Sequence, residues 1–491
     1  MSLPGLQLSA PTEVDTAAAA PLIHELPKGS EWRFEVSFGS TVEVKLLYGT
    51  AELFGTELAP NQTYTFTGTK AAIYTWHGCR LHVTGDCAVE YTAEETPMNS
   101  YANTHFALEK IRHETSLQGS KEGPRVLVVG PDDAGKTSLV KILTAYATKV
   151  GRQPIAVNLD PREGMLSVPG SLTATAVRSI LDVEEGWGSS PTSGPSPVPV
   201  KLPLVYYYGQ ESPEENKAIY KPLVTRMALA VTSRMAEDVD AREAGCVIDT
   251  PGIISQGKDG YDIIQHIVSE FSVTILLVLG SERLYTHLLR RFDNQTASTN
   301  EPISVLKISK SGGCVDRDEG YMTAVRQAQI REYFFGDARR ALSPHTQMVE
   351  LGSVHIYKYA ESCWQWRRPE ADRADVTKIA NTLLPSLLPG GATDDDPTSP
   401  ASSAAHQKLF EPLTTPSSLP QLHQSILALL HAAPSDSQET LRDAAVLGFV
   451  YVAEVDEKKG RLRVLSPVAG RLPGNVFVWG GWPGAVGELV G

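Results

Sequence analysis

Residues 125–138 read RVLVVGPDDAGKTS, and this stretch decides the fold of the middle of the chain. The run RVLVV predicts a buried strand, and the residues from Gly130 to Thr137 fit the pattern G-x-x-x-x-G-K-[ST] at every defined position. In such a loop the glycines let backbone amides and the start of the next helix face phosphate groups. Lys136 would bring its charge to the outer phosphates, and Thr137 would bring its hydroxyl to Mg²⁺. A glycine turn with an incidental lysine is the plainer alternative, but the flanking strand and helical pattern favour phosphate binding.

Apolar strands alternate with helical stretches after this motif. The strand-like runs are IAVNLD (155–160), GCVIDT (245–250), TILLVLG (274–280) and SVLKIS (304–309), and helical runs such as YDIIQHIVSEF lie between them. Strands that are apolar along almost their whole length are typical of a parallel sheet covered by helices on both faces. The sequence therefore predicts the α/β fold class, with a central P-loop domain built on a parallel sheet.

The flanking regions have a different pattern. Short alternating runs between Trp32 and Thr92, such as EWRFEVSF and CRLHVTG, predict a small all-β domain. The β-rich pattern returns after about Gly336, where VLGFVYVAEV and RLRVLSPV predict a hairpin. We therefore expect a flexible tail over 1–22, an N-terminal β-domain over 23–105, a central domain over 106–336 and a C-terminal β-rich domain over 337–491, with low-complexity insertions at 186–201 and 390–407.

Composition excludes several classes of protein. The chain has 491 residues, and its 44 basic and 57 acidic residues give a net charge of −13, which disfavours binding of nucleic acid over the whole surface but permits a confined basic groove. The five cysteines lack the spacing of a zinc site, so we expect a reducing compartment and no structural metal. No run reaches about 18 apolar residues, and the first residues lack a secretory pattern, so we expect a soluble intracellular protein without membrane contact.

Two carboxylates follow strands at the sheet edge where ligands bind in open α/β folds. Asp249 ends the strand GCVID and would join the Mg²⁺ shell, unless it only caps the following turn. Asp160 ends IAVNLD in the same way. It would act as a metal ligand or as a base beside an attacking hydroxyl, unless it too has only a local structural role.

The string DTPG suggests a GTPase, but the sequence argues against guanine recognition. That recognition needs N-K-x-D, and the only Asn-Lys pair, at 216–217, is followed by Ala-Ile. Farther on, Arg317, Arg326 and Arg331 lie on or near a helical run after SKSGG. They are candidates for a lid that stabilises transferred charge, and a solvated helix face is the alternative.

With these motifs in place, the sequence resembles the Clp subunit family of pre-mRNA cleavage and polyadenylation factor, which is related to RNA 5′-hydroxyl polynucleotide kinases. The resemblance runs through nearly the whole chain in one order and rests on EWRFEV, FTGTKAAIYTWHGC, TPMNSYANTHFALEKIR, GPDDAGKTS, GRQPIAVNLDPREGMLSVPGS, SKSGG, IREYFFG and LGFVYVAEVD. It implies a P-loop ATPase- or kinase-like domain between an N-terminal β-sandwich and a C-terminal β-rich domain, with ATP held between the first two.

The resemblance also implies which residues hold the nucleotide. Glu31, in SEWRFE, and Lys70, in TGTKAAIYTW, match the positions that reach the base in the family. Asp160 matches the general base that active members use on an RNA 5′-hydroxyl. The implied phosphate-binding residues are Asp133, Ala134, Gly135, Lys136, Thr137 and Ser138.

Three departures from the active pattern bear on function. Active members carry L-D-x-x-Q-G, but here Glu163 replaces the glutamine and adds a carboxylate near the phosphates. Ile253 stands where an aromatic residue would stack a base of the RNA, a contact that contributes about 1–3 kcal/mol. Arg317 matches the first lid arginine, whereas the second falls at Met322, and loss of such an arginine commonly costs about a thousandfold in rate.

We therefore expect an ATP-binding subunit of the 3′-end cleavage and polyadenylation complex, required for endonucleolytic cleavage. It would act through protein interaction, with ATP and Mg²⁺ as structural or gating ligands and without kinase activity. The resemblance implies a nuclear location and a large scaffold subunit as partner, the one that binds the RNA polymerase II C-terminal domain. Other subunits of the complex would also bind, and RNA contact would be weak or indirect.

Two hypotheses in which the chain is an enzyme remain open. The first is an active RNA 5′-hydroxyl kinase, because Asp160, Lys136, Thr137 and Arg317 are retained. The second, a ribosomal-RNA-processing kinase, fits less well because EWRFE and FGTEL resemble the cleavage-factor branch.

Overall fold

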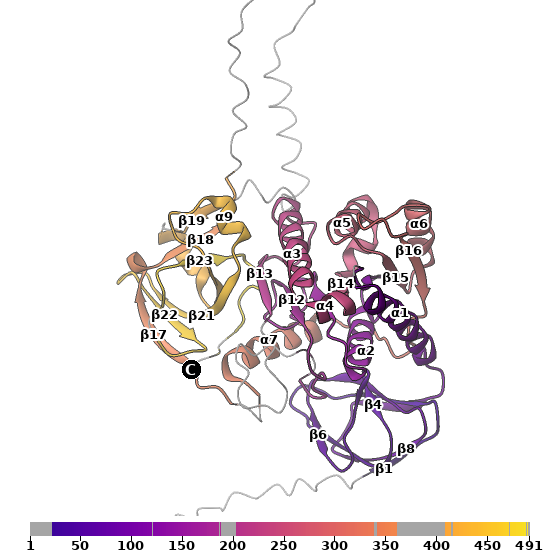
Figure 1. Cartoon of the computed structure of the whole chain (residues 1–491). Helices are drawn as coiled ribbons and strands as arrows, with labels where there is room; N and C mark the ends of the chain where they lie inside the picture. The colour runs from indigo at the N-terminus through magenta and orange to yellow at the C-terminus, as the bar shows by residue number, and fades with distance from the viewer. Residues whose placement is uncertain are drawn as a thin grey trace, which may run out of the picture. The chain divides into compact units, whose positions relative to one another are not determined.

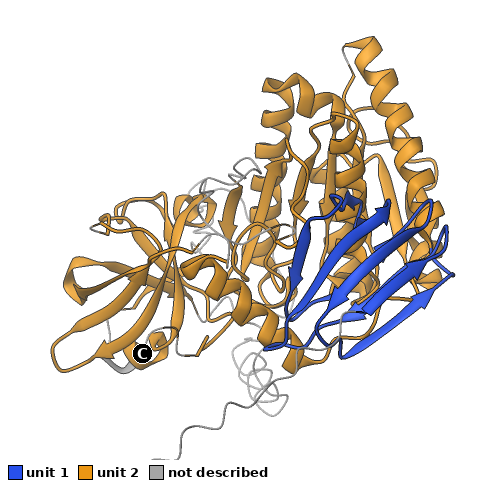
Figure 2. Cartoon of the chain, turned by 90° about the horizontal axis from the view of Figure 1, so that it is seen from below, with its two compact units in different colours: residues 1–96 blue, residues 97–491 orange. Residues whose placement is uncertain are grey.

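The computed structural model describes residues 22–119, 121–185, 187, 203–337, 341–360, 408–413, 416–470, 472–487 and 489. Within it the chain forms two compact units, one ending at Thr96 and one beginning at Pro97 (Figure 2). Nearly all of the predicted tail at 1–22 and of the predicted insertion at 186–201, and the whole predicted insertion at 390–407, lie outside the described residues.

Unit 1 is a sandwich of two antiparallel sheets, as the alternating pattern predicts. Its strands are β1 (Leu22–Leu26), β2 (Glu31–Glu35), β3 (Val42–Gly49), β4 (Glu52–Leu53), β5 (Thr56–Glu57), β6 (Thr63–Phe66), β7 (Lys70–Tyr74), β8 (Cys79–Thr84) and β9 (Val89–Ala93). One sheet has the order β1-β8-β3-β6 and the other β5-β4-β7-β2-β9. Trp32 stacks on Phe34 with ring centroids 4.4 Å apart, and Phe34 meets Phe66 of the other sheet at 5.3 Å. The sandwich core is therefore aromatic.

The first sheet of unit 2 is mixed. Its strands are β10 (Arg125–Val129), β11 (Ile155–Asn158), β12 (Ser171–Ala176), β13 (Leu204–Tyr207), β14 (Cys246–Asp249), β15 (Ile275–Leu279) and β16 (Ser304–Ile308), in the order β13-β12-β11-β14-β10-β15-β16. Strands β11, β14, β10, β15 and β16 run parallel, which confirms the predicted parallel sheet. Strands β12 and β13, which the pattern does not predict, extend it as antiparallel strands.

Helices cover this sheet on both faces (Figure 1). They are α1 (Met98–Gln118), α2 (Lys136–Lys149), α3 (Lys217–Glu237), α4 (Val239–Ala244), α5 (Gly257–Glu270), α6 (Glu282–Phe292) and α7 (Glu319–Phe335), with the short turn η1 (Gly252–Ser255). Alternate side chains of a strand point to opposite faces. Leu127 and Val129 of β10 share a hydrophobic cluster with residues of α3 and α5, while α2 packs against β10 and β14 without joining that cluster. Among the described residues, no helix combines the length and apolar character that a membrane crossing needs.

The helix predicted near Tyr101–Ile111 is the longer α1, which packs against α2 and α4. Unit 1 therefore ends at Thr96, ahead of the predicted boundary at residue 105, because α1 is continuous across that position. The division of the chain into three domains stays a prediction.

The C-terminal part of unit 2 carries a second seven-stranded sheet. Its elements are β17 (His345–Glu350), η2 (Leu351–Ser353), β18 (His355–Tyr359), β19 (Phe410–Pro412), η4 (Pro416–Leu422), β20 (Ser425–Leu430), α9 (Gln438–Asp443), β21 (Val446–Asp456), β22 (Arg461–Ser466) and β23 (Val476–Trp479). The strand order is β17-β22-β21-β20-β23-β18-β19, and the antiparallel pair β21 and β22, yellow in Figure 1, confirms the predicted hairpin. Tyr333 and Phe334 of α7 pack against Phe449 and Tyr451 of β21, so one hydrophobic cluster extends across both sheets.

The two sheets of unit 2 also meet backbone to backbone. A Cβ added at Gly209 would lie 2.7 Å from the Cα of Gly480, and Gly209 adopts a φ of +63°. Trp482 N donates to Gly209 O at 3.1 Å, and Gly480 N donates to the Tyr207 hydroxyl at 3.2 Å. No side chain fits in this seam between residues 209 and 480, so glycine is required there.

Candidate functional site

The loop between β10 and α2 forms the centre of the candidate site. A Cβ added at Gly130 would come within 2.6 Å of Leu279 O at the end of β15, and Gly135 adopts a φ of +85° where α2 begins. Both positions therefore require glycine. Lys136 is buried, and its Nζ donates to Pro131 O at 2.9 Å, so its charge lies beside the backbone amides that would face phosphates. The rest of the predicted phosphate-binding stretch lies here too: Asp133 at a φ of +53°, Ala134 buried, and Ser138 in the first turn of α2.

Thr137 and Asp249, the predicted Mg²⁺ pair, meet beside this loop. Thr137 Oγ1 donates to Asp249 Oδ2 at 2.6 Å, because Asp249 ends β14, the neighbour of β10 in the sheet. Burial raises the pKa of Asp249 to about 6, while the charge of Lys136 and the hydrogen bond from Thr137 oppose this rise. The described residues contain no cluster of three or more His, Cys, Asp or Glu side chains that would bind a metal without help. One hydroxyl and one carboxylate suit Mg²⁺, which takes its other ligands from phosphates and water.

Asp160 follows β11, which lies on the other side of β14. Its Oδ1 accepts a hydrogen bond from Arg162 N at 2.9 Å, which fixes the turn after the strand. Burial, followed by the charge of Glu163, raises the pKa of Asp160 to about 7, while Lys136 opposes the rise. A carboxyl group with a pKa near 7 is suited to proton transfer at neutral pH. The sheet thus brings both predicted carboxylates into the electrostatic environment of Lys136.

Arg317 joins two acidic residues from different parts of the site. Its Nε donates to Asp133 Oδ1 and its Nη2 donates to Glu163 Oε1, each at 2.6 Å, and its backbone N donates to Asp133 Oδ2 at 3.0 Å. Burial alone would raise the pKa of Asp133, but the bonds from Arg317 and the charge of Lys136 outweigh burial and lower that pKa. The sequence predicts Glu163 as an unfavourable extra carboxylate near the phosphates, whereas the structure pairs it with the candidate lid arginine.

The two other candidate lid arginines contact residues outside the P-loop. The Arg326 guanidinium lies 4.7 Å from the centroid of the Trp482 ring and donates to Glu319 at 2.5 Å. Arg331 lies over the ring of Phe335 at 5.3 Å, and Met322 is buried in α7. Arg326 is itself buried, so neither a phosphate lid nor a solvated helix face describes it.

Ile253 stands in η1, directly after the T-P-G string. Gly252 packs against Asp132 of the P-loop so closely that a Cβ would overlap the Asp132 backbone. Thr250 Oγ1 donates to Val128 O at 2.7 Å and ties the string to β10. Ile253 is 39% exposed, and an aliphatic side chain there offers no ring on which a base could stack.

Glu31 and Lys70 lie in unit 1, on the paired strands β2 and β7. Glu31 faces Tyr74 across the ladder and Lys70 faces Glu35, so the two residues are offset by four positions, or about 13 Å along the strands. Glu31 is buried and accepts a hydrogen bond from Arg33 Nε at 2.5 Å, while Lys70 Nζ lies 3.0 Å from a Glu35 carboxylate oxygen. The ladder therefore does not bring Glu31 and Lys70 together, and their contact with a nucleotide base stays a prediction.

Two further residues touch the site without belonging to a motif. Cys314 lies against the P-loop, because a Cβ added at Gly135 would be 2.7 Å from its Sγ. Gln329 of α7 donates from Nε2 to Gly164 O at 3.0 Å. Both contacts join segments far apart in the sequence, so no local pattern signals them.

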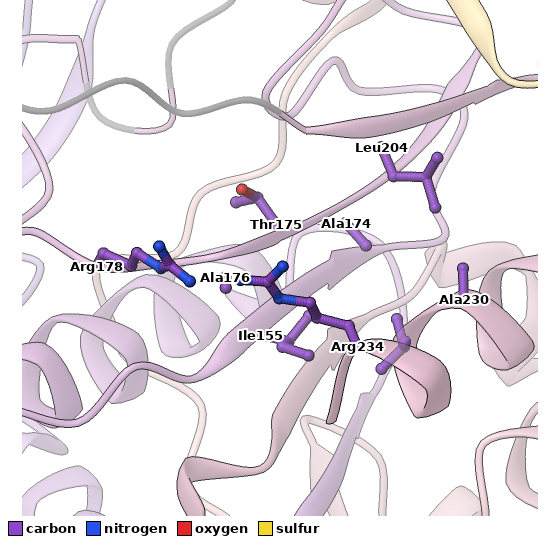
Figure 3. A pocket seen from close by; sticks show the side chains of 9 residues that line it. Ile155, Ala174, Thr175, Ala176, Arg178, Leu204, Ala230 and Arg234 are labelled. Carbon is purple, nitrogen blue, oxygen red and sulfur yellow. The ribbon is translucent and has the colours of Figure 1, made fainter. Parts of the chain in front are cut away.

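A pocket of about 440 Å³ lies elsewhere in unit 2, among β11, β12, β13 and α3 (Figure 3). Its lining residues are Ile155, Ala174, Thr175, Ala176, Arg178, Leu204, Ala230, Val231 and Arg234. The structure describes all of the predicted site residues, and none of them lines this pocket. Most of its lining residues are apolar. The two lining arginines, Arg178 and Arg234, both form ion pairs with Asp238, at 2.8 Å and 2.7 Å.

Comparison with known proteins assigns the family. The family model described as mRNA cleavage and polyadenylation factor CLP1 P-loop matches residues 130–336. The N-terminal beta-sandwich domain of polyadenylation factor matches residues 25–115, and Pre-mRNA cleavage complex II protein Clp1 matches residues 342–484. The "mRNA cleavage and polyadenylation factor clp1" of Botryotinia fuckeliana (strain B05.10) is 57% identical, and the match covers 100% of both chains. This chain belongs to the Clp1 family of mRNA cleavage and polyadenylation factors.

Other members of the Clp1 family agree with this assignment. The relative from Coccidioides immitis (strain RS) is 50% identical over 100% of both chains. A solved "Clp1p-Pcf11p (454 -563) complex" matches with a TM-score of 0.78 and 30% identity, covering 94% of this chain and 98% of that one. A second solved structure, "Extended interface between Pcf11p and Clp1p and structural basis for ATP loss in Gly135Arg point mutant", matches with a TM-score of 0.77 and 31% identity over the same shares. The resemblance and the fold class predicted from the sequence are therefore confirmed.

Proposed function

We propose that this Clp1 family member is an ATP-binding subunit of the pre-mRNA 3′-end cleavage and polyadenylation complex that acts through protein interaction. ATP would be a structural or gating ligand and not a phosphate donor. One contrast carries the proposal. The P-loop is complete, with Lys136 buried and Thr137 bonded to Asp249, whereas the candidate lid arginine, Arg317, is bound by two carboxylates.

The residues of the P-loop fit a nucleoside triphosphate with Mg²⁺. Lys136 and the backbone amides of residues 133–138 would bind the phosphates, and Thr137 and Asp249 would hold the metal ion. The phosphates of the bound nucleotide would pair with the positive charge of Lys136, and Mg²⁺ would offset the negative charge of the buried Asp249 carboxylate. A ligand that binds only the folded chain stabilises it by RT ln(1 + [L]/Kd), so ATP would stabilise the surface that a partner binds.

The proposed partner follows from the solved relatives, whose descriptions place Clp1p in complexes with Pcf11p. We infer that this chain binds the corresponding large scaffold subunit, the one that contacts the RNA polymerase II C-terminal domain, together with other cleavage subunits. The words "ATP loss" in the description of one relative's point mutant support ATP as a ligand of the family. A nuclear location fits a role in mRNA processing, and a net charge of −13 favours weak or indirect RNA contact.

An RNA 5′-hydroxyl kinase is the second candidate function. Asp160 favours it, because a carboxyl with a pKa of about 7 is suited to accept the proton of an RNA 5′-hydroxyl. Ile253, which lacks a stacking ring, and Met322, which is buried and uncharged, weigh against it.

One experiment separates the two functions. One portion of the purified chain is denatured to release and identify any bound nucleotide, and a second, native portion is incubated with γ-labelled ATP and an RNA that has a 5′-hydroxyl. Bound ATP in the parent, its loss in Lys136→Ala and no transfer of label would support the proposal. Label transfer that both Lys136→Ala and Asp160→Ala abolish would replace it with the kinase function.

A further inference from the structure

Arg317 is held by three hydrogen bonds to two carboxylates from separate segments. Asp133 belongs to the P-loop, and Glu163 belongs to the loop after β11. The exposed fractions are 28% for the Arg317 side chain, 14% for Asp133 and 27% for Glu163. Charge-assisted hydrogen bonds at such partly buried positions are stronger than those at the open surface. We call these three residues the Arg317 latch.

The latch closes a segment over the P-loop. Cys314, three residues before Arg317, lies against Gly135, where an added Cβ would be 2.7 Å from the Cys314 Sγ. The backbone N of Arg317 also donates to Asp133, so the main chain of this segment, and not only a side chain, is attached to the loop. Residues 314–317 therefore lie against the half-buried phosphate-binding loop at Gly135 and Asp133.

Glu163 gives the latch a firm attachment. Gln329 of α7 donates to Gly164 O, next to Glu163, and the Tyr333 hydroxyl of the same helix accepts from Phe449 N at 3.0 Å in β21. Arg326 of α7 also lies over Trp482. The loop with Glu163 is therefore tied to α7 and through it to the C-terminal sheet, so Glu163 holds Arg317 from a fixed position.

We propose that Glu163 is a positioning residue that acts through Arg317: it holds the Arg317 guanidinium against Asp133, keeps residues 314–317 closed over the P-loop and so slows exchange of the nucleotide. That the ligand is a nucleotide rests on the proposed function. The contacts that hold residues 314–317 against the P-loop do not depend on any ligand. A glutamine at position 163 would keep the shape of the side chain and remove the charge that binds Arg317.

The first test uses the nucleotide-free, full-length chain and the thiol of Cys314 as a reporter. We expect Glu163→Gln to raise the rate of Cys314 alkylation by iodoacetamide about tenfold, which corresponds to about 1.4 kcal/mol, when the modified peptide is quantified by mass spectrometry. Arg317→Ala should raise the rate by a similar factor. Because both changes open the same latch, the double variant should react no faster than the single ones.

Glu211→Gln is the matched control. Glu211 pairs at 3.3 Å with Arg162, the residue next to Glu163 in sequence, so the control removes the charge of one carboxylate that is bound to the same loop but is not a partner of Arg317. It should leave the alkylation rate unchanged. Circular dichroism and thermal denaturation of all variants check that they are folded.

The second test measures dissociation of a fluorescent ATP analogue, chased with unlabelled ATP. Glu163→Gln should release the analogue about tenfold faster than the parent, again about 1.4 kcal/mol. An unchanged alkylation rate would overturn the latch, and so would an unchanged release rate in a chain that binds nucleotide. A parent chain that binds no nucleotide would contradict the proposed function instead, while the alkylation rates would still decide on the latch.

Discussion

The floor and the cover of the candidate site are built in different ways. The floor, residues 130–138 with Asp249, comes from one loop and adjacent strands of one sheet, and its groups face each other as phosphate and Mg²⁺ ligands would require. The cover, residues 314–335, reaches the floor through the ion pair of Arg317 with Asp133, and a second ion pair joins Arg317 to Glu163 of the loop after β11. The contrast teaches that the two sets of groups are held differently: those of the floor are bonded to one another within one sheet edge, whereas the arginine of the cover is bonded to carboxylates of two other segments.

The largest expected effect comes from breaking the floor. Lys136→Ala removes the cation of the P-loop, and loss of charge-assisted hydrogen bonds of about 2–3 kcal/mol predicts an ATP affinity about a hundredfold lower. Isothermal titration calorimetry measures the affinity. Lys149→Ala, an exposed lysine in the last turn of the same helix, should bind ATP as the parent does. Equal affinities of Lys136→Ala and Lys149→Ala would show that the floor does not bind the phosphates.

A second prediction concerns Asp160, which lies close enough to the floor to feel the charge of Lys136, and it depends on pH. The pKa of Asp160 is about 7 in the folded chain, above its ordinary value of 3.8, so its contribution to stability is fully present below about pH 4 and is lost as pH rises through 7. Asp160→Asn carries no ionising group and escapes this loss. Without nucleotide, we expect Asp160→Asn to be more stable than the parent by about 2 kcal/mol at pH 8, after a discount for partial solvent access, by a clearly smaller amount at pH 5, and by nearly nothing below pH 4.

Thermal denaturation of both proteins at pH 5 and pH 8 measures this difference. Asp249, with a pKa of about 6, remains in both chains and loses stability with rising pH in the same direction, so the comparison cancels its own pH dependence and keeps only its charge interaction with Asp160. A difference in stability that stays constant between the two pH values would contradict the raised pKa of Asp160.

The smallest expected effect tests the attachment of the cover. Trp482→Leu removes the ring under the Arg326 guanidinium and should lower the free energy of unfolding by about 1–2 kcal/mol through the lost cation–π contact. ATP affinity should change less than in Lys136→Ala, because Trp482 contacts Arg326 of α7 and Gly209, which lie outside the floor. Urea denaturation measures the stability. A loss of ATP affinity as large as that of Lys136→Ala would show that floor and cover are not separable.

Most of the floor could be predicted from the sequence, because its chemistry lies in contiguous residues or at the ends of apolar strands. Lys136 and Thr137 stand in one motif, and Asp160 and Asp249 each close a strand of the parallel sheet. The antiparallel strands β12 and β13 escaped prediction because SLTATA has no apolar run and its pairing with LVYY is a tertiary effect. Propensity alone does not decide such strands.

The cover could not be predicted in the same way. Arg317 and Glu163 are 154 positions apart, and no spacing rule joins charges over such a distance. Burial of Arg326 against Trp482 depends on the C-terminal sheet, which folds back onto α7. The sequence supplied the residue types in these contacts, but the tertiary fold selected the partners.

The seam between Gly209 and Gly480 has a consequence for the synthesis of the chain. Unit 1 is complete once Thr96 has left the ribosome, but unit 2 cannot close its core until Gly480 and Trp482 have been added. At about 5–20 residues per second, translation of the intervening stretch takes on the order of tens of seconds. During that interval the apolar residues of α3, α7 and β13 that pack against the C-terminal sheet have not yet met their partners.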